Sequence, residues 1–140
     1  MPHFVLEYSN NLKVKKTHLS LFTKFHNLAE EKLGIDKLNC KSRAVRRKNF
    51  YVGDGDPNHA FVHLTIRLFE GHNPAAKQEV GSIALGLLQD FYKKSSKKLI
   101  FQPSVEIVEI KKDHYFKLTA EEILSNKLTE KKHHKKDETD

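Results

Sequence analysis

The chain begins with a proline next to the initiator methionine and continues as a short β-type stretch, Met1-Pro2-His3-Phe4-Val5-Leu6-Glu7. Phe4 and Leu6 fall on one side of an extended chain, and Val5 and Glu7 fall on the other. This alternation predicts a strand over residues 3–8. The strand decides the fold, because it opens an order of elements that occurs twice in the sequence.

The residues after this strand complete one strand–helix–strand unit. A helix is predicted over residues 18–33, where apolar side chains recur at helical spacing. Gly34 follows it, at the position where a helix end favours a residue that tolerates positive φ. Residues 38–45 form a second predicted strand, which a cationic run extends toward residues 50–52. The composition of residues 53–58 predicts a loop.

The same order then begins again. Residues 60–68 are strongly β-prone, residues 75–94 have a 3.6-residue apolar rhythm, and residues 104–110 alternate as a strand does. Each unit needs a crossover that makes its two strands parallel. Side by side, the units predict an α+β domain with a four-stranded mixed sheet and both helices on one face. The other face would be a bare apolar surface, which predicts an oligomer with cyclic symmetry.

The last part of the chain is predicted to be an extension of a domain that spans residues 1–118. Thr119 and Glu122 have the spacing of a capping box, so a short helix is expected to about Leu128. The final dozen residues are charged and carry no apolar side chain. We therefore expect residues 119–140 to form a short helix followed by a disordered tail.

Length and composition narrow the class of protein. A chain of 140 residues suffices for one domain with its own core. No apolar run approaches the roughly 18 residues of a membrane span, and the first residues lack the features of a signal peptide. The single cysteine, Cys40, supplies neither a disulfide nor a zinc-binding pair. A cytoplasmic protein without a metal site or membrane contact is expected.

The formal net charge of +7 is concentrated before the C-terminal tail. From residue 111 onward, eight lysines face seven acids, whereas residues 1–110 carry 17 Lys or Arg against 11 acids. The densest cluster is Lys41, Arg43, Arg46, Arg47 and Lys48. It could meet phosphates or a small anion, or it could be a solvated strand edge where charge prevents stray pairing.

The second residue offers a candidate catalytic group. A methionine before so small a residue is normally removed, which would leave the secondary amine of Pro2 at the chain start. An α-amino group titrates near about 8 in water, and burial lowers its pKa toward neutrality. Such an amine would suit general base catalysis, although a proline that merely opens a strand is the simpler interpretation. With Met1 attached, the Pro2 nitrogen is an amide and is not basic.

Three groups of residues together resemble the tautomerase superfamily, and specifically the 5-carboxymethyl-2-hydroxymuconate Δ-isomerase family. They are Pro2-His3-Phe4 with Glu7, Ser42-Arg43, and Ala60-Phe61-Val62-His63-Leu64-Thr65. The resemblance spans roughly residues 2–117. It implies paired β-α-β units, a homotrimer, a role in the catabolism of aromatic compounds, and an amino-terminal proline base that needs no metal or organic cofactor.

The resemblance also implies a reaction and a set of site residues. The Pro2 amine would take the enol proton of a 2-hydroxymuconate-like dienol and return a proton to carbon. Arg43 would bind a carboxylate of a small dicarboxylate-type substrate, because a guanidinium matches a carboxylate in a two-point fashion.

Two positions depart from the family pattern. Lys41 stands two places before Arg43, where close relatives carry another arginine. Lysine keeps the positive charge but lacks the forked guanidinium that binds a carboxylate at two points. His72 stands in the turn before the second helix, where members often have arginine, and an ordinary histidine is largely neutral at pH 7. Lys41 and His72 are the further candidates for substrate binding, behind Arg43.

A second functional hypothesis is a non-catalytic binding module on the same scaffold. It would use the basic residues 41–48 to bind nucleic acid or a protein partner, with salt-sensitive affinity. The sequence holds no RNP, zinc-finger or helix-turn-helix pattern. Nucleic acid is therefore the less favoured partner, and the fold alone does not decide between the two hypotheses.

Overall fold

The computed structural model describes residues 1–139, with side chains through His133. Its elements are β1 (His3–Ser9), α1 (Leu19–Leu33), the 3-10 turn η1 (Lys37–Asn39), β2 (Lys41–Arg47), β3 (His59–Phe69), α2 (Pro74–Phe91), β4 (Ile100–Ile110), η2 (Lys112–His114) and α3 (Ala120–Thr139). The first seven of these contain the two predicted strand–helix–strand units in order.

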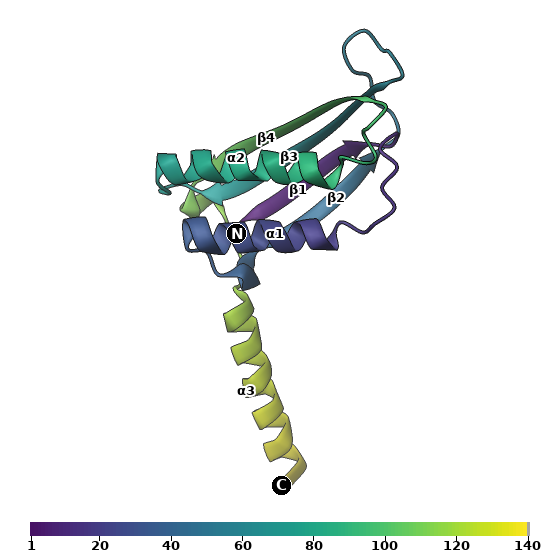
Figure 1. The fold of residues 1–140 in the computed structure, drawn as a ribbon. Coiled ribbons are helices and arrows are strands. Elements are labelled where there is room, and N and C mark those ends of the chain that lie inside the picture. Colours follow the sequence, from purple (N-terminus) through teal and green to yellow (C-terminus); the bar gives the residue numbers. More distant parts are fainter. Residues whose placement is uncertain (140) are drawn as a thin grey trace.

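The four strands form one mixed sheet in the order β2-β1-β3-β4. Within each unit the two strands are parallel, because the helix between them carries the chain back to the end of the sheet where the first strand began. The two units join through the antiparallel pair β1–β3. Both α1 and α2 lie against the same face of the sheet (Figure 1). The predicted fold class is therefore confirmed.

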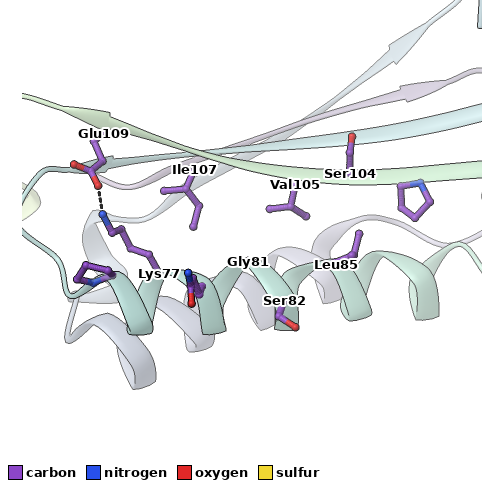
Figure 2. A pocket seen from close by; sticks show the side chains of 11 residues that line it. Lys77, Gly81, Ser82, Leu85, Ser104, Val105, Ile107 and Glu109 are labelled. Carbon is purple, nitrogen blue, oxygen red and sulfur yellow. Dashed lines mark hydrogen bonds and ion pairs between the residues drawn. The ribbon is translucent and has the colours of Figure 1, made fainter.

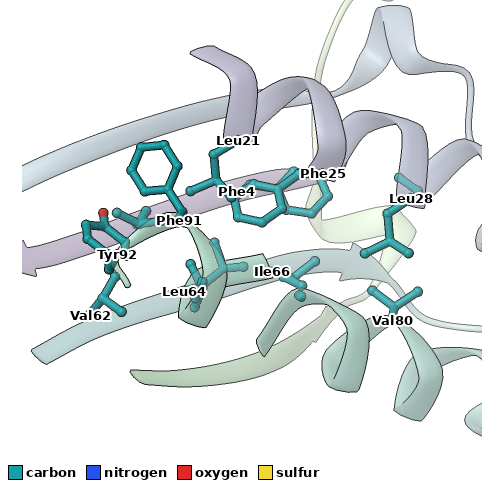
Figure 3. Close-up of a cluster of buried hydrophobic side chains, with 14 of the residues drawn as sticks. Phe4, Leu21, Phe25, Leu28, Val62, Leu64, Ile66, Val80, Phe91 and Tyr92 are labelled. Carbon is teal, nitrogen blue, oxygen red and sulfur yellow. The ribbon is translucent and has the colours of Figure 1, made fainter. Parts of the chain in front are cut away.

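The core lies between this face and the two helices (Figure 3). Even-numbered residues of β1 and β3 point into it, so Phe4, Leu6, Leu64 and Ile66 are at most 1% exposed. They meet the apolar stripe of α1, and the rings of Phe4 and Phe25 stack with their centroids 5.3 Å apart. The period of two in the strands and of 3.6 in the helices thus buries one common set of side chains.

The observed ends of the elements differ from the predicted ends for local reasons. β2 begins at Lys41 rather than residue 38, because the Asp36 side chain accepts a hydrogen bond from Leu38 and starts η1 instead. β4 begins at Ile100 rather than residue 104 and includes Pro103. An edge strand tolerates proline, since one side of it needs no ladder donor.

The first turn of α2 is held by its N-cap, Asn73. The Asn73 side chain accepts hydrogen bonds from the backbone N–H groups of Ala75 and Ala76, at 2.8 and 3.4 Å. We expect Asn73→Ala to lower the free energy of unfolding by about 1 kcal/mol, because these donors lose their acceptor. Denaturant titration measures the change. Asn73→Asp keeps the acceptor and is the matched control; an equal loss in both variants would contradict the role of the cap.

The uncovered face of the sheet is more polar than the sequence predicted. Its centre carries His63, whose ring nitrogens lie 2.6 Å from Ser104 Oγ and 2.9 Å from Glu106 Oε1. Near one edge, Arg47 pairs with Glu7. The expectation of a large bare apolar face was therefore wrong, because the outward-facing residues of neighbouring strands pair with one another in this register.

The C-terminal extension is helical over a longer span than expected. Thr119 and Glu122 form the predicted capping box, with each side chain accepting from the other residue's backbone N–H. However, α3 continues to Thr139, past the predicted end near Leu128. Lysine and glutamate are good helix formers, which accounts for a helix where composition predicted disorder. Figure 1 shows α3 pointing away from the sheet.

No helix within residues 1–139 is long and apolar enough to cross a membrane.

Candidate active site

Pro2 lies at the very start of β1, at the edge of the sheet where β2 also begins. Its residue is buried, and its carbonyl accepts a hydrogen bond of 3.1 Å from the backbone N–H of Lys41. This bond adds to the parallel pairing of β1 with β2, which places His3 opposite Lys41 and Val5 opposite Arg43. The register therefore fixes the start of the chain beside two of the predicted site residues.

A cavity of about 280 Å³ adjoins the start of the chain. Met1 forms one wall, and the turn between β3 and α2 forms another through Gly71 and His72. Ile35 and Leu68 add apolar surface, and Lys112 adds a cation. Met1 is only 5% exposed, so its removal would enlarge this cavity at the point where the Pro2 nitrogen lies.

The surroundings of the chain start disfavour a charged amine. The pKa of the Met1 ammonium group is lowered to about 5, first because burial penalises the charged form. Hydrogen bonding to Lys117 and the positive charges of Lys117 and Lys41 lower it in the same direction. These causes act on the amine of the chain that retains Met1.

Arg43 is held by a chain of hydrogen bonds on the uncovered face. Its Nη1 lies 3.0 Å from His3 Nδ1, and His3 Nε2 lies 2.7 Å from the Tyr115 hydroxyl. Because a guanidinium only donates, Nδ1 must accept and the proton of the neutral ring must be on Nε2. Burial and the charge of Arg43 both lower the pKa of His3, which agrees with a neutral ring.

The guanidinium of Arg43 has hydrogen-bonding capacity to spare. Four of its five N–H donors remain after the bond to His3, and the residue is exposed. His3 therefore orients the fork without neutralising it. This arrangement suits a carboxylate that approaches from the uncovered face.

The structure brings the four predicted residues to one end of the sheet but not into one cavity. His72 lines one cavity together with Met1, the residue before Pro2. Lys41 and Arg43 share the uncovered face with His3. The Lys41 ammonium lies 3.5 Å from the Asn39 carbonyl.

Sequence reasoning missed His3, Tyr115 and Lys117 as members of this site. His3 could have been assigned from strand alternation, because it must face the same side as Arg43 in a parallel pair. Tyr115 and Lys117 lie in the irregular segment after β4, and no pattern in the sequence places that segment over the start of β1. The T-shaped contact of Tyr115 with Phe69, with centroids 5.5 Å apart, holds it there.

The basic run over residues 41–48 does not form one surface. Arg43 and Arg47 project from the uncovered face, where they bond to His3 and Glu7. Arg46 projects from the other face and lines a cavity together with Tyr8 and His18. The alternation of β2 therefore divides the cluster that the second hypothesis treated as continuous.

The largest of the described cavities lies elsewhere, between α2 and β4 (Figure 2). It measures about 810 Å³ and has an apolar wall that includes Leu85, Val105 and Ile107. An ion pair of Lys77 with Glu109 lies at one end. None of the predicted site residues lines it, and its apolar wall offers no acid–base chemistry.

Comparison with known proteins identifies the family. A sequence model of the 5-carboxymethyl-2-hydroxymuconate isomerase family matches residues 2–122. The 5-carboxymethyl-2-hydroxymuconate Delta-isomerase of Escherichia coli is 27% identical over 111 residues, which cover 79% of this chain and 87% of that protein.

Solved structures show the same fold. A crystal structure of a 5-carboxymethyl-2-hydroxymuconate isomerase from Deinococcus radiodurans R1 matches with a TM-score of 0.75 and 26% identity, covering 84% of this chain and 89% of that one. A fused 4-OT symmetric trimer matches with a TM-score of 0.63 and 12% identity, over 83% and 93% of the two chains, and shows the fold alone. The prediction of an isomerase on a tautomerase scaffold is confirmed at the level of the family. The chain belongs to the 5-carboxymethyl-2-hydroxymuconate isomerase family, within the tautomerase superfamily.

Proposed function

We propose that the chain, once Met1 is removed, is a cofactor-independent tautomerase with the Pro2 amine as its general base. The substrate is a small unsaturated keto acid with two carboxylates, similar to 2-hydroxymuconate. The observation that carries the proposal is the buried position of Pro2 at the chain start, where a cavity adjoins Met1 and where burial lowers the pKa of the Met1 amine to about 5. A base must be neutral to accept a proton at pH 7, and this environment keeps an amine neutral.

The reaction balances within the substrate and one amine. The Pro2 nitrogen takes the proton of the enol hydroxyl, and the electron pair of that O–H bond forms the ketone as the conjugated double bonds shift. The prolinium then returns its proton to the carbon at the far end of the shifted system, which gives an α,β-unsaturated ketone. The base is restored, so no cofactor or second substrate takes part.

The cations around the chain start have two roles in this proposal. Arg43 binds a substrate carboxylate with its remaining donors, oriented by His3. Lys41 and Lys117 raise the positive potential at the amine and stabilise the dienolate that develops during proton transfer. His72 forms part of the cavity wall beside the chain start and contacts the far end of the substrate.

We propose further that the active form is a homotrimer. In a single chain, the cavity beside Met1 and the guanidinium of Arg43 are separate. A neighbouring copy that packs at this end of the sheet would bring its own Arg43 toward the Pro2 nitrogen and so complete the site. One structural relative, a fused 4-OT, forms a symmetric trimer.

The proposed function is tested by a pH profile of kcat/KM, measured from the absorbance change as 2-hydroxymuconate ketonises. Because the base must be unprotonated, kcat/KM should rise with pH through the pKa of Pro2 and level off once the amine is neutral. Burial lowers that pKa, so we expect the plateau to be reached below pH 7 rather than near the ordinary value of about 8. Absence of ketonisation by the methionine-processed protein would refute the proposed function. A value of kcat/KM that keeps rising up to pH 8 or above would refute the proposal that burial lowers the pKa of Pro2.

A further inference from the structure

A second charged site lies at the end of β1 that is opposite to Pro2. Two neighbouring cavities, of about 250 and 500 Å³, share the segment from Lys13 to Lys16 as a common wall. Their other walls come from the end of β2 and from the end of α2. The seven residues of β1 separate this region from Pro2 by roughly 20 Å at about 3.3 Å per residue. It is therefore independent of the candidate active site.

The walls of the two cavities carry a large excess of positive charge. The cations are Lys13, Lys15, Lys16, Arg46, Lys93 and Lys94, whereas the only acid in the two linings is Asp90. Within residues 1–133, none of these six cations forms an ion pair. All six are exposed, so their charges remain available to a ligand.

Buried aromatic side chains lie beneath these lysines. Phe91 is 8% exposed and Tyr92 is fully buried, and the Lys16 ammonium lies 4.4 Å from the centroid of the Phe91 ring. This contact keeps at least one lysine close to the cavity wall rather than free in solvent. The Tyr92 hydroxyl is 2.8 Å from His18 Nε2, which ties the end of α2 to the segment that precedes α1.

The start of α1 adds backbone donors to the same region. His18 is the N-cap of α1 and makes no side-chain capping bond, and the first turn contains no acidic residue. The first intrahelical bond is donated by Phe22. The N–H groups of the first turn of α1 follow His18, which lines the smaller of the two cavities.

The chemistry of these groups selects phosphate over carboxylate and over nucleic acid. Five of the six cations are lysines, which bind tetrahedral phosphates as point charges, whereas carboxylates favour the arginine fork that occurs at the other end of the sheet. Binding of single strands uses aromatic rings on which bases stack. Among the rings that line the two cavities, Phe91 is 8% exposed and lies under the Lys16 ammonium, and Tyr8 and His18 are half-buried, so little ring surface is open for stacking.

We propose that the two cavities form one binding site for a small ligand with three or more linked phosphate groups. The Lys13–Lys16 segment contacts the central phosphate, while Arg46 and the pair Lys93 and Lys94 bind the groups on either side. A free polyphosphate and a nucleoside polyphosphate share this chemistry, and the experiment separates them.

The test is isothermal titration of the full, methionine-processed chain with tripolyphosphate at physiological salt. We expect saturable binding, weakened about tenfold or more in the double variant Lys13→Gln/Lys15→Gln because two charge-assisted contacts are lost. The control, Lys131→Gln/Lys132→Gln, removes the same charge from α3 and should bind as the parent does. Ketonisation activity should be unchanged in both variants, because neither pair lies near Pro2.

Parallel titrations with ATP and with a single-stranded oligonucleotide distinguish the sources of phosphate. Binding of ATP tighter than tripolyphosphate would add a nucleoside contact to the site, and equal binding would assign it to the phosphates alone. Acylation of lysines followed by mass spectrometry provides a readout without mutation: tripolyphosphate should protect Lys13, Lys15 and Lys16 but not Lys131. Absence of saturable binding, equal weakening in both double variants, or tighter binding of the oligonucleotide would overturn the proposal.

Discussion

Replacement of Pro2 by alanine should lower kcat/KM for 2-hydroxymuconate by about 10²- to 10⁴-fold, the usual contribution of a positioned general base. Alanine is also small enough to allow removal of Met1, so the variant still begins with an amine. That amine rotates freely, whereas the pyrrolidine ring fixes φ and the direction of the nitrogen lone pair. The loss therefore reports on the placement of the base in the buried chain start.

A second protein separates basicity from placement. If Met1 is retained, the ring of Pro2 remains but its nitrogen is an amide without useful basicity. The structure shows that Met1 fits this position, since it is only 5% exposed and leaves the pairing of β1 intact. We expect the Met1 form to be as inactive as Pro2→Ala, with an unchanged melting temperature for both. Full activity in either protein, checked by intact mass spectrometry, would remove Pro2 from the mechanism.

The fold was predictable because each strand carries a pattern that has one physical solution. The alternation in residues 60–68 could bury only Ala60, Val62, Leu64, Ile66 and Leu68 together, and all five are at most 1% exposed. The apolar side chains on one side of each predicted helix had to pack against the sheet, and the parallel strands within each unit required helical crossovers. These constraints lead to the observed sheet without knowledge of any long-range contact.

The polar face was not predictable in the same way. The partner of His63 depends on which residue of β4 lies opposite, and that is set by a register in which His63 faces Ser104. Sequence alone placed the start of β4 four residues too late, after Pro103. Without the register, the outward-facing residues could not be recognised as a hydrogen-bonded set, and the face was taken for an apolar one.

The active-site departures also acquire a physical meaning from the structure. Lys41 has no fork for a carboxylate, yet it is one of the charges that lower the pKa of the amine at the chain start. His72 lines the cavity beside Met1 and forms part of its wall. The proposed site thus divides its work between cations that tune the base and one arginine that binds substrate.

Arg43 should therefore carry most of the substrate recognition. We expect Arg43→Ala to lower kcat/KM about 10- to 100-fold, mainly through KM, because a charge-assisted contact to a carboxylate contributes about 1.5–3 kcal/mol. Arg43→Lys keeps the positive charge but loses the two-point geometry of the guanidinium and its bond to His3. We therefore expect its kcat/KM to lie between that of the parent and that of Arg43→Ala. Arg47→Ala is the matched control, since Arg47 lies on the same strand and face but is paired with Glu7 at the far end. If Arg43→Ala and Arg47→Ala have equal effects on kcat/KM, the loss comes from the total charge of the face, and Arg43 is not the carboxylate ligand.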